Sequence, residues 1–108
     1  MPKYLTKVKY HPETIKILMK KGGTARKKHV AESAKSLGGK LEWFYFAFGG
    51  TDVYCVFDFP SEVEATALSV AVGARGALGI ETVVLISPET MDKAVKKAAG
   101  YQGGTAPK

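Results

Sequence analysis

A basic segment that follows two glycines is the first candidate for chemistry in this sequence. Arg26 and His29 are three residues apart, which places them one turn apart on a helix that begins after Gly22 and Gly23. The free N–H groups at a helix start attract anions, and the neighbouring lysines add positive charge. The segment is therefore either a site for a carboxylate or phosphate, or a polar edge that faces solvent or a partner.

Asp52 is the second candidate, because it lies where a glycine turn is expected. Its carboxylate either bonds the N–H groups of the turn or meets a ligand at the mouth of a pocket, together with Gly50. Asp52 and His29 are the candidates for catalytic proton transfer. His11 and His29 are the only histidines, so we expect neither a metal site nor a bound cofactor. Cys55 is expected to be a small buried hydrophobe.

Two aromatic strands joined by the glycine turn make residues 44–60 the most distinctive stretch of the chain. Side chains alternate across a strand, and here both resulting faces are apolar. Helices in a domain of this size cover one face, so a second subunit or a ligand is expected on the other. We assign Trp43, Tyr45 and Tyr54 to an interface between subunits. The alternative is that Tyr10, Trp43, Tyr45 and Tyr54 line an apolar ligand pocket.

The net charge of +6 conceals a separation of charge along the chain. Residues 1–40 hold eleven Lys and Arg and two acids, whereas residues 41–92 hold one arginine and eight acids. A nucleic-acid surface would set aromatic side chains beside the lysines, but here the aromatics are concentrated in the acidic half. Nucleic acid is therefore not an expected partner, and the separated charges suit self-association.

The cellular setting is predicted from cysteine usage and hydropathy. One cysteine cannot form an internal disulfide, which favours a reducing compartment. No apolar run approaches the length of a signal-peptide core or a membrane span. We expect a cytoplasmic protein with no membrane partner.

The order of predicted elements is strand, helix, strand, strand, helix, strand, followed by one more helix. This βαββαβ order is that of an α+β, ferredoxin-like fold, with a four-stranded antiparallel sheet and helices on one face. Residues 1–99 are expected to form one domain and residues 100–108 a flexible tail. The predicted strands are 3–10, 40–48, 53–59 and 80–87, and the helices follow Pro12, Thr24 (as cap), Ser61 (with Glu64 in a capping box) and Ser87. The first strand offers two alternating sets for the uncovered face, one containing Tyr4 and Thr6 and the other Leu5 and Lys7.

Several short motifs, specific in combination, resemble the GYD domain family of small bacterial and archaeal proteins. They are residues 22–26, 37–40, 44–54, 58–60 and 84–89. The resemblance covers residues 1 to about 97 and implies a ferredoxin-like fold of the dimeric α/β-barrel type, with no established activity. The Gly-Tyr-Asp of the family name reads Gly50-Thr51-Asp52 here, so a tyrosine is replaced.

No motif specifies a reaction, so the expected function is one of binding and assembly. We predict a self-associating domain that binds a small anionic or aromatic ligand or serves as a non-catalytic assembly unit. The candidate ligand contacts are Arg26, His29, Tyr45, Gly50 and Asp52. The alternative is a small cofactor-free enzyme in which His29 or Asp52 transfers a proton in a pocket between sheet and helices.

Overall fold

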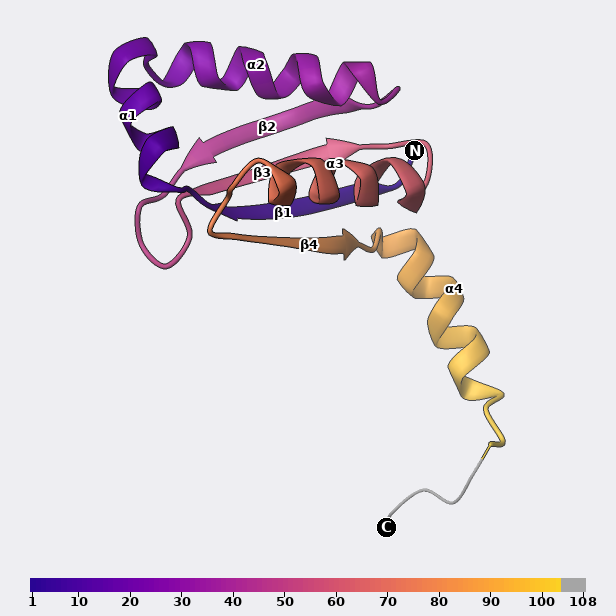
Figure 1. The fold of residues 1–108 in the computed structure, drawn as a ribbon. Coiled ribbons are helices and arrows are strands. Elements are labelled where there is room, and N and C mark those ends of the chain that lie inside the picture. Colours follow the sequence, from indigo (N-terminus) through magenta and orange to yellow (C-terminus); the bar gives the residue numbers. More distant parts are fainter. Residues whose placement is uncertain (104–108) are drawn as a thin grey trace.

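The computed structural model describes residues 1–103 and shows one four-stranded antiparallel sheet with the strand order β2-β3-β1-β4 (Figure 1). This order and the succession of elements confirm the predicted ferredoxin-like fold with an added C-terminal helix. The elements are β1 (Lys3–Lys9), α1 (Pro12–Lys21), α2 (Gly23–Ser36), β2 (Lys40–Phe46), β3 (Val53–Asp58), α3 (Glu62–Ala74), β4 (Gly79–Leu85) and α4 (Pro88–Ala99).

Local signals fix most helix boundaries. The Ser61 hydroxyl accepts a hydrogen bond from the Val63 N–H at 3.2 Å and donates to the Glu64 carboxylate at 2.6 Å. Ser61 and Glu64 thus meet at the helix start, through a bond between their side chains rather than the reciprocal backbone bonds of a full capping box. Ser87 caps α4 in the same way, by accepting from the Thr90 N–H. The second helix differs from the prediction: it begins at Gly23 rather than after a Thr24 cap, and its N-cap, Gly22, supplies no side-chain bond.

The turn between β2 and β3 also differs from the prediction. We expected the glycines at 49 and 50 to supply positive φ, but Phe48 does so, with φ of 54°. A hydrogen bond of 2.9 Å from the Ala47 N–H to the Asp52 carbonyl oxygen closes the turn. Strand β2 consequently ends at Phe46, two residues earlier than predicted, because the left-handed residue turns the backbone out of the sheet.

One face of the sheet is covered by helices, and the structure decides which set of β1 residues lies there. Tyr4 and Thr6 are buried on the covered face, while Leu5 and Lys7 are half-exposed on the open face. Helix α2 packs against β2 and helix α3 against β4. The turn before β2 passes so close to Phe59 that a Cβ on Gly39 would lie 2.4 Å from its ring.

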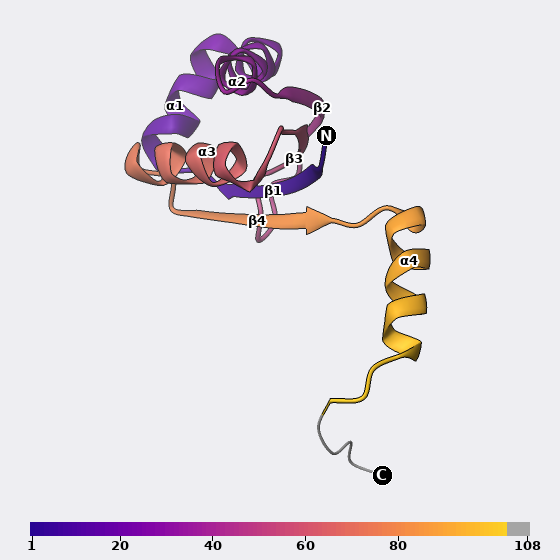
Figure 2. The same ribbon diagram turned by 90° about the vertical axis from the view of Figure 1, so that its right-hand side faces the viewer.

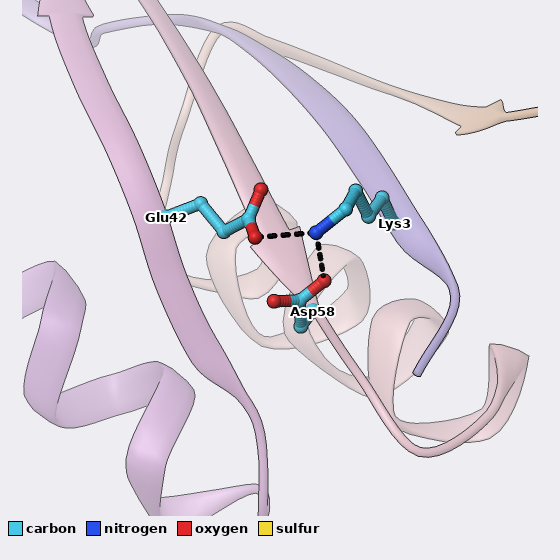
Figure 3. A network of polar contacts seen from close by, with 3 residues as sticks. All are labelled: Lys3, Glu42 and Asp58. Atoms are coloured by element: carbon cyan, nitrogen blue, oxygen red, sulfur yellow. Dashed lines mark hydrogen bonds and ion pairs between the residues drawn. The ribbon is translucent and has the colours of Figure 1, made fainter. Parts of the chain in front are cut away.

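The open face carries a charged network at the start of β1 (Figure 3). A β-bulge between Leu41 and Trp43 shifts the register of β2, and Glu42 is the extra residue. The Lys3 ammonium donates to the carboxylates of both Glu42 and Asp58, the latter at 2.9 Å. The bonds to the two carboxylates raise the pKa of Lys3, and the bond from Lys3 lowers the pKa of Asp58.

Helix α4 lies apart from the rest of the domain. It extends beyond β4, the strand at that edge of the sheet, and points away from the other helices (Figures 1 and 2). All of its residues are exposed. The predicted tail begins at Gly100, where α4 has ended, and residues 104–108 of that tail lie outside the described part of the chain.

Candidate functional site

A cavity of about 330 Å³ lies over the middle of the covered face. Helix α2 packs on one side of this face and α3 on the other, so the central strands β1 and β3 form the floor between them. Its walls and floor come from α2, α3, β1 and β3, with side chains that include Val30, Leu68, Val8 and Phe57. A volume of this size suits a small ligand of one or two rings.

The floor of the cavity is largely apolar, and its cysteine is a poor nucleophile. Val53 and Phe57 are buried there, with Cys55 between them on the same strand face. The Cys55 thiol lies 3.7 Å from the Thr6 carbonyl oxygen, to which it donates. Burial raises the pKa of Cys55 to about 12, so the thiol stays protonated at neutral pH and is a poor nucleophile.

A tyrosine and an arginine meet at one end of the cavity. Arg26 Nε donates to the Tyr10 hydroxyl at 3.3 Å, and the guanidinium carbon lies 5.1 Å from the centre of the tyrosine ring. The pair is thus joined by a hydrogen bond and a cation–π contact. Burial raises the pKa of Tyr10, although Arg26 opposes part of the rise, so the hydroxyl is protonated at neutral pH.

The remaining polar groups make the cavity a basic environment. His29 and Arg75 line it from α2 and from the end of α3, and both are exposed, which places them toward solvent. Ser33, one turn after His29, lines it as well but donates its hydroxyl to the His29 carbonyl. No aspartate or glutamate is among the described residues that line this cavity. An anion placed here meets cations without a competing carboxylate.

Residues 4–95 match the sequence model of the GYD domain. The chain belongs to the GYD domain family. This confirms the resemblance that its glycine and aromatic motifs indicated. Neither a curated protein nor a solved structure is similar enough to the chain to count as a match.

The aspartate of the GYD motif does not line the cavity. Asp52 is buried at the end of the hairpin turn, where its carboxylate accepts from the Tyr10 N–H at 2.9 Å and from Lys9 Nζ at 3.1 Å. Its own N–H donates to the Val8 carbonyl. Burial by itself raises the pKa of Asp52, but the Tyr10 N–H and Lys9 outweigh it and lower that pKa overall. In this GYD domain, the hydrogen bonds of Asp52 therefore join the hairpin turn to the end of β1.

The structure therefore divides the predicted ligand contacts of this GYD domain between two places. Arg26 and His29 both line the cavity, as predicted for one site. Tyr45 is 67% exposed on the open face, and Gly50 is exposed in the hairpin loop. The two candidates for proton transfer, His29 and Asp52, are not brought together, because Asp52 is not among the cavity residues.

The predicted interface residues share the open face of the sheet. Trp43 and Tyr45 are exposed neighbours on β2, with ring centroids 5.5 Å apart. Tyr54 lies opposite Tyr45 on β3 and is half-exposed. The structure thus gathers Trp43, Tyr45 and Tyr54 on one surface, separate from the cavity.

Two cavity residues were not among the predicted ligand contacts. Tyr10 belonged to the alternative in which four aromatic residues line a pocket, and the structure places it in the cavity beside Arg26. Arg75 is the single basic residue of the acidic stretch 41–92, and this isolation is the one feature of the sequence that sets it apart.

Residues 1–103 contain no group of three His, Cys, Asp or Glu side chains that could hold a metal ion. Within the same residues no helix is long and apolar enough to span a membrane.

Proposed function

We propose that this GYD domain is a self-associating protein that binds a small aromatic anion in the cavity between its sheet and helices α2 and α3. The observation that carries the proposal is the composition of the cavity: an apolar floor of central-strand residues with Arg26, His29 and Arg75 around it. An aromatic ring would bury against the floor, and its carboxylate or similar group would meet the guanidinium groups of Arg26 and Arg75.

Arg26 is the residue expected to orient the ligand. A guanidinium has five N–H donors, and one of them is directed to the Tyr10 hydroxyl. That bond and the contact with the ring hold the group in place, so binding an anion costs little additional side-chain entropy. The fork-shaped guanidinium matches a carboxylate, which it can bind through two parallel hydrogen bonds.

Self-association is proposed through the open face of the sheet. At its β2 edge this face carries the exposed rings of Trp43 and Tyr45, and at its β4 edge the exposed side chain of Leu85 with Val83 half-buried on the same strand. Apolar surface of this kind, interrupted by charged residues, is typical of protein interfaces. If the cavity binds nothing, this surface alone supports a role as an assembly unit.

The ligand proposal is tested with two probes of similar shape, benzoate and benzyl alcohol. We expect benzoate to bind, benzyl alcohol to bind at least tenfold more weakly, and Arg26→Gln to remove this preference. Lys27→Gln is the matched control, because it removes one charge from the next position of α2, and Lys27 is exposed and is not a cavity residue. Calorimetry measures all six affinities, those of the two probes for the unmodified chain and for each of the two variants. Equal binding of both probes, or equal losses in the two variants, contradicts the proposal.

The alternative function, proton-transfer catalysis without a cofactor, has one observation in its favour. His29 lines the cavity, and an imidazole is the side chain that most often acts as a general acid or base. If a bound compound is converted, His29→Gln should abolish turnover while leaving benzoate affinity within about threefold. A variant with full turnover excludes this role.

A further inference from the structure

Helix α4 is amphipathic, yet all of its residues are exposed. Its apolar side chains recur at i, i+3, i+4 and i+7 and so form one stripe: Met91, Ala94, Val95 and Ala98. Its lysines lie away from this stripe: Lys93, Lys96 and Lys97. The two largest apolar side chains, Met91 and Val95, are 52% and 59% exposed. A single helix of this length is marginally stable in water, so the stripe needs a surface to pack against.

The apolar stripe continues a surface that begins on the sheet. Leu85 ends β4 on the open face, because it pairs in register with Lys3, whose side chain belongs to that face. Ile86 follows and is 55% exposed, and Ser87 and Pro88 then start the helix. The connection is short, and Ser87 has the extended conformation typical of a residue before proline. Exposed apolar side chains therefore follow one another along the chain from Leu85 through Ile86 into the stripe of α4.

The size of the open face points to a second copy of the chain as the partner. The sheet has four strands of 6 or 7 residues. With about 4.8 Å between strands and about 3.3 Å per residue, its flat area is about 440 Å². A stable interface buries about 800 Å² of accessible surface on each partner. Protruding side chains make the accessible surface of the sheet larger than its flat area, and α4 would add further area from each side. This inference rests on the self-association proposed above.

The strand register shows where α4 would reach. Lys3 pairs with Leu85 on one side and with Asp58 on the other, and Asp58 pairs with Lys40. The end of β4 from which α4 leaves is thus at the same end of the sheet as the start of β2. A two-fold axis parallel to the strands lays β4 of one copy over β2 of the other. In that arrangement α4 leaves the first sheet close to Trp43 of the second copy.

We infer that α4 of one copy packs its apolar stripe on the open sheet face of a second copy, beside Trp43, and that two such helices complete a symmetric dimer. Each helix would cover part of the exposed aromatic edge of the other sheet. The inferred partner for α4 is therefore this chain itself.

The first test compares the dimer affinity of three full-length proteins by analytical ultracentrifugation. Met91→Asp/Val95→Asp should weaken the dimer by roughly 30-fold or more, because two interface side chains become charged. Lys93→Ala/Lys97→Ala changes the net charge by the same amount at the same spacing but spares the stripe, and should stay within about threefold of the unmodified chain. Helix α4 is exposed, so circular dichroism should show an intact sheet in both variants.

Together, these outcomes distinguish a failure of the helix inference from a failure of self-association itself. A monomeric unmodified chain overturns both. A dimer that persists in Met91→Asp/Val95→Asp overturns the role of α4 and leaves sheet pairing standing. A dimer weakened equally by the two variants shows that charge, not the apolar stripe, is responsible, and overturns the inference.

The second test locates the helix by cross-linking. A ¹⁵N-labelled chain with Val95→Cys is mixed with an unlabelled chain with Lys40→Cys and treated with a short bis-maleimide; Cys55 is buried and should not react. A cross-linked product that contains one labelled and one unlabelled chain supports packing on the second copy. Its absence overturns the placement. Cross-linking within a single chain that carries both cysteines, without the mixed product, shows that α4 folds back on its own sheet.

Discussion

The two faces of the sheet use the same strands and differ in what covers them. On β1 the covered face presents Tyr4, Thr6 and Val8, and the alternating open face presents Lys3, Leu5 and Lys7. The covered face is apolar around a cavity whose cations come from the helices, whereas the open face mixes exposed aromatic rings with paired charges. Such a division suits a ligand on one side and a protein partner on the other.

The largest expected effect is on the covered face. Phe57 is 1% exposed, and Phe57→Ala should lower the free energy of unfolding by about 3–5 kcal/mol because it removes a packed ring from beneath the cavity. Tyr45→Ala on the open face should lower the free energy of unfolding by less than about 0.5 kcal/mol. Urea unfolding measures both variants, at a dilution at which the chain is monomeric. Similar costs in the two variants would contradict the contrast between the faces.

Gly39 tests the close packing at the rim of the covered face. A Cβ at this position would lie 2.4 Å from the Phe59 ring and 2.5 Å from the Asp58 carbonyl oxygen. Gly39→Ala should therefore destabilise the fold by about 1–3 kcal/mol, measured by thermal unfolding. Gly49→Ala is the matched control, since no atom lies within 4 Å of the added Cβ. An unchanged stability in Gly39→Ala would mean that the contact between position 39 and Phe59 leaves room for a methyl group.

Tyr45→Lys tests the open face as an interface. A charged side chain in place of the 67% exposed ring should weaken dimerisation by roughly 10- to 30-fold. Val63→Lys, at an equally exposed aliphatic residue of α3, should have no such effect. Dimer dissociation followed by native mass spectrometry distinguishes them. An unchanged dimer in Tyr45→Lys would assign the ring to another role, such as a ligand contact.

The smallest effect is expected from the charges of the open face. The pKa of Asp58 is lowered from its ordinary 3.8, chiefly by the Lys3 hydrogen bond, so the stabilisation is present above about pH 4 and is lost as pH falls through the lower pKa of the folded state. Asp58→Asn should cost at most about 1 kcal/mol at pH 7 and reduce the loss of stability in acid. Glu13→Gln, in an exposed pair with Lys16, is the control. Urea unfolding at pH 7 and pH 3 measures the two variants and the unmodified chain. Parallel pH profiles for Asp58→Asn and the unmodified chain would contradict a stabilising role of the Asp58 carboxylate.

Local sequence signals were sufficient for the fold. Alternation, proline positions and the Ser61 and Ser87 caps predicted the elements and their order, because each depends on neighbours in the chain. The misplaced turn residue has a cause outside the hairpin, because Asp52 is held by β1 and by Tyr10 after it. Phe48 takes the positive φ that two adjacent glycines could have supplied, since closure of the turn depends on where β3 and Asp52 are held.

The candidate site was only partly predictable, because it depends on distance through space. Arg26 and His29 share a helix turn, so their spacing alone placed them together. Tyr10 and Arg75 join them only because β1 and the end of α3 meet α2 around the same cavity. Asp52 resembled a catalytic acid in sequence, yet its partners are Lys9 and the Tyr10 N–H, on a strand more than forty residues away.

The sequence by itself determined the elements, their order, the membership of the GYD family and the two-faced hairpin, since these follow from short-range preferences and periodicity. Only the tertiary structure decided which alternating set of β1 faces the helices, where the cavity lies, and that α4 extends from the domain with its apolar stripe exposed. The physical reason is that burial and cavities depend on how separate elements pack, and alternation within one strand is the same whichever face is covered.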